Sequence, residues 1–264
     1  MTPEQMVSRL LYRDALMLVI DKPAGLAVHR GPPNSDPGRE CLQDHFDALR
    51  FGLPRPPALA HRLDRDTSGC LVLGRHRKAL AQLGRLFKSG AVEKTYWAVI
   101  EGSPDGDEGI IELPLGRLDA TRGWWMKHDP EGQRSVTKWK VMGRLSPRGE
   151  RLGPKEDGEI AWLALEPLTG RTHQLRVHCA EMGWPIVGDA IYGNAPRSGG
   201  PGLHLHAREI AVPLYKNRAP IRVTAPVPAH MRERLAACGW RKELGNVSQC
   251  ERTHSPSATT AGED

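Results

Sequence analysis

HRLDRDTSG, residues 61–69, sets one carboxylate among arginines just before a turn. Asp64 comes two positions after Arg62 and directly before Arg65. Neighbouring cations favour the ionised form of a carboxylate, so we expect Asp64 to be an anion at neutral pH that can act as a nucleophile or a base. The same segment is also typical of a charged surface cluster that ends in a turn. Both interpretations stay open until more distant segments are considered.

The chain is long enough to form one domain with a sizeable core. It has 264 residues, of which 39% are hydrophobic, and this composition resembles neither a collagenous nor a wholly disordered protein. Beyond Gly245 the chain is rich in Ser, Thr, Pro and Ala, a composition that does not support a core. We therefore expect a single domain over residues 1–244 and a disordered tail over residues 245–264.

The charge balance is compatible with a polyanionic partner. The formal net charge of the chain is +6, and the tail holds three acids against one arginine, so the preceding domain carries about +8. Nucleic acid, an acidic membrane surface and plain solubility would each account for such a charge. Charge alone does not choose among them.

The cysteines and the N-terminus indicate a soluble cytoplasmic protein. The five cysteines are odd in number, widely spaced and without a C-x-x-C pair, so they predict neither a disulfide framework nor a zinc knuckle. The first residues lack a basic start followed by an apolar run, and no stretch approaches the roughly 18 apolar residues of a membrane span. We expect no membrane partner and a cytoplasmic location.

Hydrophobic periodicity predicts an α+β domain with a mixed, largely antiparallel central sheet flanked by helices and loops. The predicted strands mostly follow one another directly, which argues against a regular βαβ array. A helix is expected to begin with Thr172 as its N-cap and to stop at Gly183. The other elements, read from their apolar patterns, are strands at 16–20, 71–73, 96–100, 110–115, 136–142, 160–168, 203–205 and 221–224 and helices at 41–49, 76–88 and 229–238.

Several alternative sites carry weaker signals. The pairs His173 with His178 and His204 with His206 suggest a metal site, but a spacing of five puts the first two rings on different faces of a helix, and we favour structural histidines and no metal. G-x-S-x-G, Walker and G-x-G-x-x-G motifs do not occur. In the loop-rich segment 116–134, Trp124 and Trp125 would either stack on bases or anchor a hairpin, and both interpretations stay open.

The segment GRTHQLRVH, residues 170–178, places two arginines and two histidines in the first turns of a predicted helix. A helix N-terminus with arginines is a natural place to hold an anion. If this element faces the loop of Asp64, Arg176 would pair with that carboxylate and Leu175 would add an apolar wall. The alternative is that Arg176 pairs with any other of the 31 acidic residues.

Together these segments resemble the RluA-like family of RNA pseudouridine synthases. The resemblance covers roughly residues 10–228, and the His-Arg-Leu-Asp-x-x-Thr-Ser-Gly pattern is its most specific part. We match no family motif to the segment 116–134. The motifs that carry the resemblance occur in the family's order and are DKPAGL at 21–26, HRLD at 61–64 with TSG at 67–69, KTYWAV at 94–99, GRTHQLRVH at 170–178 and PIVGD at 185–189.

The resemblance implies the pseudouridine synthase fold, with a catalytic cleft across the sheet, and isomerisation of a uridine within RNA without cofactor or metal. It makes Asp64 the catalytic aspartate, places Tyr96 against the uracil and Leu175 in the base pocket, and pairs Arg176 with Asp64. It also implies that Arg62 fills the space left by the extruded uridine. Our own addition is that His61 helps to orient Arg62.

The implied partner is RNA, a stem-loop of 23S ribosomal RNA, of tRNA or of both, and we expect a monomer. Because the first motif begins near the N-terminus, we expect no N-terminal S4-type RNA-binding module. Two rival functions are an inactive RNA-binding protein of the same fold and a metal-dependent nuclease. The presence of Asp64, Tyr96 and Arg176 argues against the first, and the lack of clustered carboxylates argues against the second.

Overall fold

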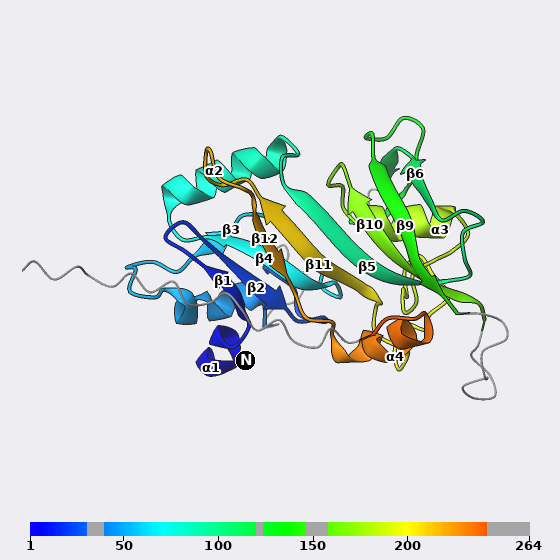
Figure 1. Ribbon diagram of the computed structural model, residues 1–264, viewed down its shortest axis with the longest axis horizontal. Helices are drawn as coiled ribbons and strands as arrows, with labels where there is room; N and C mark the ends of the chain where they lie inside the picture. Colours follow the sequence, from blue (N-terminus) through cyan, green and yellow to red (C-terminus); the bar gives the residue numbers. More distant parts are fainter. Residues whose placement is uncertain (31–39, 120–123, 146–157, 242–264) are drawn as a thin grey trace, which may run out of the picture.

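The computed structural model describes residues 1–30, 40–119, 124–145 and 158–241, so the predicted tail at 245–264 lies outside the described part. Figure 1 labels the helices and strands in chain order. The helices are α1 Pro3–Val7, the 3-10 helix η1 Leu42–Leu49, α2 Arg77–Lys88, α3 Gln174–Glu181 and α4 Ala229–Ala237. The strands are β1 Leu10–Arg13, β2 Met17–Lys22, β3 Ala58–Leu59, β4 Ser68–Gly74, β5 Glu93–Glu101, β6 Glu108–Glu112, β7 Leu115–Arg117, β8 Met126–His128, β9 Val136–Arg144, β10 Ile160–Pro167, β11 Leu205–Val212 and β12 Ile221–Thr224.

A ten-stranded sheet forms the centre of the molecule, in the order β1-β2-β4-β11-β5-β10-β9-β6 (Figure 1). Strand β12 extends it from β11, β3 pairs with β4, and β7 and β8 form a separate two-stranded sheet. The β4–β11 pair is parallel, and the other strand pairs of the described residues are antiparallel. The predicted α+β class with a mixed, mostly antiparallel sheet is therefore confirmed.

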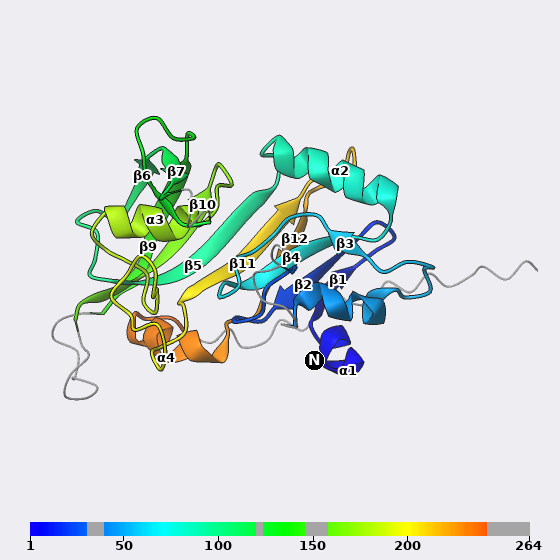
Figure 2. The same ribbon diagram turned by 180° about the vertical axis from the view of Figure 1, so that it is seen from behind.

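Helices cover both faces of the sheet because side chains alternate along each strand. Ala98 and Ile100 of β5 pack against Leu175 and Cys179 of α3, whereas Val99 packs with α4 on the opposite face. In the other half of the sheet, η1 and α1 cover one face and α2 covers the other. Figure 2 looks onto the face that carries α3 and the β7–β8 hairpin.

The two halves of the sheet meet at the β4–β11 pair, where the segment 61–69 enters the sheet. Ala207 of β11 lies opposite Gly69 of β4. Gly69 has φ +105°, and a Cβ at this position would overlap the backbone carbonyl of Ala207. Glycine is therefore required for the close approach of the two backbones. Tyr96, on the neighbouring strand β5, packs against hydrophobic clusters from both halves.

Several predicted elements differ from the structure. The strand predicted at 110–115 is divided into β6 and β7, which belong to different sheets. Strand β11 runs over Leu205–Val212 rather than 203–205. The apolar pattern misses its continuation because the polar side chains are satisfied internally: His206 bonds Ser68 and Glu209 pairs with Arg222. Helix α3 begins at Gln174 with His173 as N-cap, so the predicted N-cap Thr172 is wrong.

The start of α3 is set by a side chain that replaces a conventional cap. The Gln174 Oε1 accepts the backbone N–H of Arg171 at 3.1 Å, and the Thr169 hydroxyl donates to the same oxygen at 2.7 Å. Because Gln174 satisfies the turn from inside the helix, His173 takes a left-handed conformation with φ 52°. A non-glycine residue in this region is uncommon and worth a functional explanation.

Candidate active site

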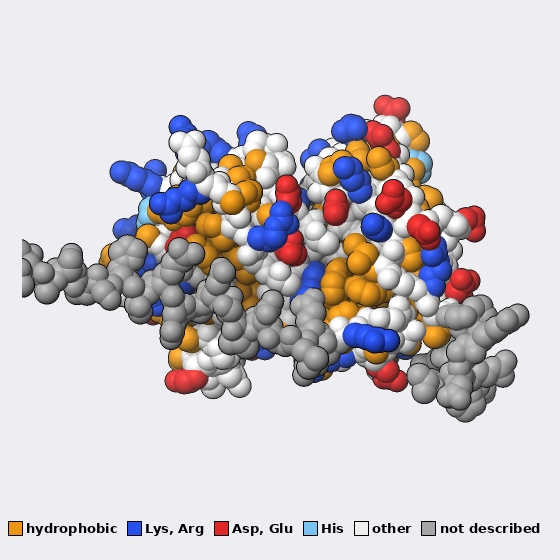
Figure 3. Space-filling view, in the orientation of Figure 1, with side chains coloured by type: hydrophobic (Ala, Val, Ile, Leu, Met, Phe, Trp, Pro, Cys, Tyr) orange, Lys and Arg blue, Asp and Glu red, His pale blue; other side chains and the backbone are white. Residues whose placement is uncertain are grey.

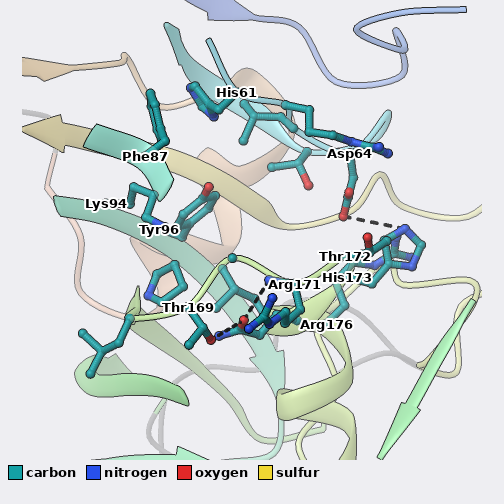
Figure 4. Close-up of a pocket in the computed structure, with 18 of the residues that line it drawn as sticks. His61, Asp64, Phe87, Lys94, Tyr96, Thr169, Arg171, Thr172, His173 and Arg176 are labelled. Carbon is teal, nitrogen blue, oxygen red and sulfur yellow. Dashed lines mark hydrogen bonds and ion pairs between the residues drawn. The ribbon is translucent and has the colours of Figure 1, made fainter. Parts of the chain in front are cut away.

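Segments far apart in the chain meet at a cavity of about 580 Å³, a size typical of ligand sites. They are the loop at 61–67, the end of α2 at 87–90, the start of β5 and the turn at 167–176 that leads into α3. The six residues assigned from the sequence to catalysis or substrate binding line this cavity, and Figure 4 shows several of them around it. They are His61, Arg62, Asp64, Tyr96, Leu175 and Arg176.

The loop that carries Asp64 is fixed from below by a buried lysine. Lys22, at the end of β2, is fully buried. Its Nζ donates to the carbonyl oxygens of Pro23 at 2.7 Å, Arg65 at 2.8 Å and Thr67 at 2.8 Å. Burial lowers the pKa of Lys22 to about 7, against the charges of Asp66 and Asp64. Three acceptors are satisfied together only by an ammonium with three N–H bonds, so the geometry is that of the protonated lysine.

Asp64 faces His173 across one end of the cavity (Figure 4). The Asp64 side chain is 23% exposed, and its Oδ2 lies 3.8 Å from Nε2 of His173. The left-handed backbone at position 173 presents this buried ring to the carboxylate. Burial lowers the pKa of His173, while the charge of Asp64 opposes that shift. A neutral imidazole beside Asp64 follows.

A chain of hydrogen bonds orients the ring of His173. The backbone N–H of Met126 in β8 donates to the Tyr192 hydroxyl at 2.9 Å, and that hydroxyl lies 2.7 Å from Nδ1 of His173. This bond holds the imidazole ring with its Nε2 turned toward the carboxylate of Asp64.

The ion pair predicted between Arg176 and Asp64 is replaced by a pair with Asp189. The Nε and Nη2 of Arg176 each donate to one oxygen of Asp189 at 2.7 Å. Asp189 also accepts the backbone N–H groups of Ile191 and Tyr192, and this fork geometry suits a buried arginine. Burial alone would lower the pKa of Arg176, but the bonds to Asp189 and the nearby charge of Asp64 raise it. Arg176 therefore acts on Asp64 at a distance.

Tyr96 and Leu175 form the walls of the cavity. Both pack in the hydrophobic cluster that joins β5 and α3, because Tyr96 points from the α3 face of β5. Burial raises the pKa of the Tyr96 hydroxyl, and the charge of Asp64 raises it further. The phenol thus keeps its proton at every physiological pH, and its ring offers an apolar surface with one polar end.

Arg62 and His61 both line the cavity. The Arg62 side chain is exposed, whereas that of His61 is half-buried. His61 is held by β4 and α2, because its Nε2 accepts the backbone N–H of Val72 at 3.0 Å and its ring stacks on Phe87 at 4.4 Å. Burial lowers the pKa of His61 to about 3, helped by the charge of Lys94 and opposed by a backbone hydrogen bond to Arg62.

The other histidines considered as metal ligands are bound within the protein. His178 contacts the Thr137 hydroxyl and the Leu113 carbonyl, and His204 contacts the Gly202 carbonyl. Within the part of the chain that the structure describes, no group of three His, Cys, Asp or Glu side chains is arranged to hold a metal ion. The helices of this part are also too short or too polar to cross a membrane.

Sequence reasoning missed four residues that shape the site: Lys22, His173, Asp189 and Tyr192. Three of them lie in motifs that carry the family resemblance: Lys22 in the segment 21–26, His173 in the segment 170–178 and Asp189 in the segment 185–189. Tyr192, three positions beyond Asp189, carries no motif of its own. Its link to His173 and Met126 exists only in the folded chain.

Comparisons with known proteins show the family of this chain. Residues 16–181 match the family of RNA pseudouridylate synthases. An RNA pseudouridine synthase of Zymomonas mobilis is 40% identical over 225 residues, covering 84% of this chain and 95% of the relative. The ribosomal large subunit pseudouridine synthase C of Vibrio cholerae is 30% identical over 232 residues, covering 86% of this chain and 68% of the relative.

A solved structure extends the agreement to the fold. Human RNA pseudouridylate synthase domain containing 4 superposes with a TM-score of 0.69 at 25% identity, covering 89% of this chain and 95% of the human chain. The match to the family spans the Asp64 loop, Tyr96 and all of α3. The chain therefore belongs to the RluA-like family of RNA pseudouridine synthases, and it is an isomerase.

Proposed function

We propose that the protein converts specific uridines in structured RNA to pseudouridine, with Asp64 as the catalytic carboxylate. The observation that carries this proposal is the convergence of Asp64, Tyr96 and Leu175 on one cavity. A partly exposed carboxylate, a protonated phenol and an apolar wall together suit a flat, polar-edged base attached to a sugar. The catalytic unit of the proposal is the domain over residues 1–244.

The reaction exchanges one glycosidic bond for another without net gain or loss of atoms. The C1′–N1 bond breaks, the uracil turns in the pocket, C5 bonds to C1′, and the proton of C5 leaves while N1 gains one. Asp64 is placed to stabilise positive charge at C1′ or to attack it, as carboxylates do in glycosidases. Tyr96 holds the detached uracil by stacking, and its hydroxyl is available for the proton transfer.

The supporting charges keep Asp64 in place while the base moves. His173 lies beside Asp64, with Nε2 3.8 Å from Oδ2, and limits the directions in which the carboxylate can turn. Arg176, neutralised in part by Asp189, adds positive potential behind the carboxylate without bonding to it. Preorganised groups of this kind need no rearrangement during the reaction.

The target uridine must leave its stack to reach the cavity, at a cost of a few kcal/mol. Arg62, exposed at the cavity edge, would fill the vacated space with a planar guanidinium that stacks between bases. His61, which contacts the backbone of Arg62, would limit the directions that this side chain can take.

The RNA class is proposed from the surface and the relatives. Arg62, Lys88 and Arg171 border the cavity, whereas the face shown in Figure 3 mixes Lys and Arg with many Asp and Glu side chains. Phosphates therefore bind best at the cavity rim. The Vibrio cholerae relative is named for the ribosomal large subunit, which supports 23S ribosomal RNA as a target, with tRNA stem-loops as the alternative.

The test is incubation of the protein with RNA that contains C5-tritiated uridine, in the presence of a chelator. The proposal predicts release of tritium from RNA that stays intact. Binding without release would identify an inactive RNA-binding protein, and strand cleavage that depends on added metal would identify a nuclease; either result contradicts the proposal. Pseudouridine maps of total RNA from cells with and without the protein then separate ribosomal RNA from tRNA targets.

A further inference from the structure

Trp124 contacts His173, the neighbour of Asp64, and is exposed to solvent. Its side chain is 55% exposed, and it is the one aromatic ring among the exposed large hydrophobic side chains of the described residues. Its ring meets that of His173 edge to face, with centroids 5.6 Å apart. His173 lines the cavity and faces Asp64 at 3.8 Å, so the ring of Trp124 is one side chain away from the cavity that contains Asp64.

The β7–β8 hairpin fixes the position of Trp124. Leu118 in the loop after β7 donates its backbone N–H to the Trp125 carbonyl at 2.8 Å, and Met126 donates to Tyr192 at 2.9 Å. The ring of Trp125 packs edge to face against that of Trp124 at 5.5 Å. Trp125 is the less exposed of the pair, so it anchors the hairpin while Trp124 is held out toward solvent.

The surroundings fit a nucleic acid strand. The guanidinium of Arg197 lies 5.6 Å from the centre of the Trp125 ring, and Arg62 and Arg171 are exposed at the same cavity. An aromatic face beside cationic side chains is the arrangement that binds single-stranded nucleic acid, because each base stacks on the ring while phosphates contact the cations.

We propose that Trp124 is a stacking platform for an unpaired base next to the target uridine. The inference rests on the proposed function, because extrusion of the uridine unstacks its neighbours and leaves a base that needs a new surface. Stacking on Trp124 would recover part of that cost and set the distance between the flanking nucleotide and Asp64. Trp124 lies in the segment 116–134, to which we match no family motif, so the platform would distinguish this chain's choice of RNA.

The test is a cycle of two proteins and two RNA hairpins. The first hairpin has a loop of uridines, and the second keeps one uridine among abasic nucleotides. We expect Trp124→Ala to weaken binding of the all-uridine loop by about 10- to 100-fold, the range of one lost base stack. The same substitution leaves binding of the abasic loop unchanged. Trp124→Phe keeps a ring and retains most of the affinity.

Ile110→Ala is the matched control, because Ile110 is also an exposed large apolar side chain but lies on the edge strand β6 and not in the hairpin that contacts His173; it should bind both hairpins like the unmodified protein. Equal losses of Trp124→Ala on the two hairpins, or no loss on either, would overturn the platform. Tritium release from the same hairpins is read in parallel. Absence of tritium release from the unmodified protein contradicts the proposed function. The binding measurements test the role of Trp124 separately, so the two failures are distinguishable.

Discussion

Single residues around Asp64 determine how its carboxylate is presented. Asp64 itself was predicted from the sequence because its neighbours and the distant motifs pointed to it, and the cavity brings it together with Tyr96 and Leu175. The partner of Arg176 was not predictable. The chain has 31 acidic residues. Arg176 pairs with Asp189 rather than Asp64 because backbone N–H groups of the turn at 189–192 hold the Asp189 carboxylate in position to accept both N–H bonds of the guanidinium.

The hydrogen bond from Tyr192 is expected to act on catalysis through His173. Tyr192→Phe keeps the ring beside Arg176 but removes the hydroxyl that bonds Nδ1 of His173, so the imidazole beside Asp64 is held less firmly. We expect kcat to fall about tenfold, which corresponds to one hydrogen bond, while KM stays unchanged. Steady-state rates of tritium release measure both constants.

Tyr215→Phe is the control for this substitution, because it also removes a hydroxyl that bonds a neighbour, Asp14, but far from the cavity. Its kcat should equal that of the unmodified protein. The positioning role of His173 is rejected if both variants lose activity equally, or if Tyr192→Phe changes KM alone.

The elements show which parts of the fold were readable from sequence. Strands β2, β5, β10 and β12 and helices α2 and α4 followed the apolar periodicity closely. Strand β11 did not, because buried polar side chains such as His206 and Arg208 interrupt its pattern while bonding inside the sheet. The start of α3 was misplaced because Gln174 caps the turn from within the helix, which local propensity does not anticipate.

The anchor between β2 and the Asp64 loop gives a prediction at this scale. Lys22→Met preserves length and apolar stem but leaves the carbonyls of Pro23, Arg65 and Thr67 without their buried donor. We expect the free energy of unfolding to fall by about 3 kcal/mol and kcat to fall with it, since the loop that carries Asp64 loosens. Urea denaturation and tritium release measure the two effects.

Lys78→Met, at an exposed position of α2, removes the same charge without breaking a buried contact. It should change the free energy of unfolding little. Similar values for the two variants would contradict the anchoring role of Lys22.

At the scale of the whole molecule, buried neutral histidines make stability depend on pH. Burial lowers the pKa of His204 and of His206 from 6.5 to about 4. Both pKa values are lower in the folded chain than in the unfolded chain. As the pH falls from about 6.5 toward 4, the unfolded chain therefore binds protons at these histidines and the folded chain does not. This stability is complete above pH 6.5 and is lost below it, by about 1.4 kcal/mol per pH unit for each histidine.

Urea denaturation between pH 7 and pH 5 measures this slope. His206→Gln removes one of the titrating groups. It should reduce the change in unfolding free energy per pH unit by the contribution of one proton, whatever its effect on stability at pH 7. A free energy of unfolding that stays constant over this range, or a slope unaffected by His206→Gln, would contradict the assignment of neutral buried histidines.

The central claim is that Asp64 carries out the chemistry, and two neighbouring carboxylates allow a direct test. Asp64→Asn and Asp66→Asn each remove one negative charge from the same loop, but Asp64 lines the cavity whereas Asp66 pairs with Arg65 at the surface. The measurement is single-turnover tritium release from C5-tritiated RNA, with RNA affinity determined alongside. The account predicts that Asp64→Asn binds RNA normally and loses at least about 10²–10⁴-fold in rate, while Asp66→Asn reacts like the unmodified protein. Substantial release by Asp64→Asn, or an equal loss in Asp66→Asn, would contradict it.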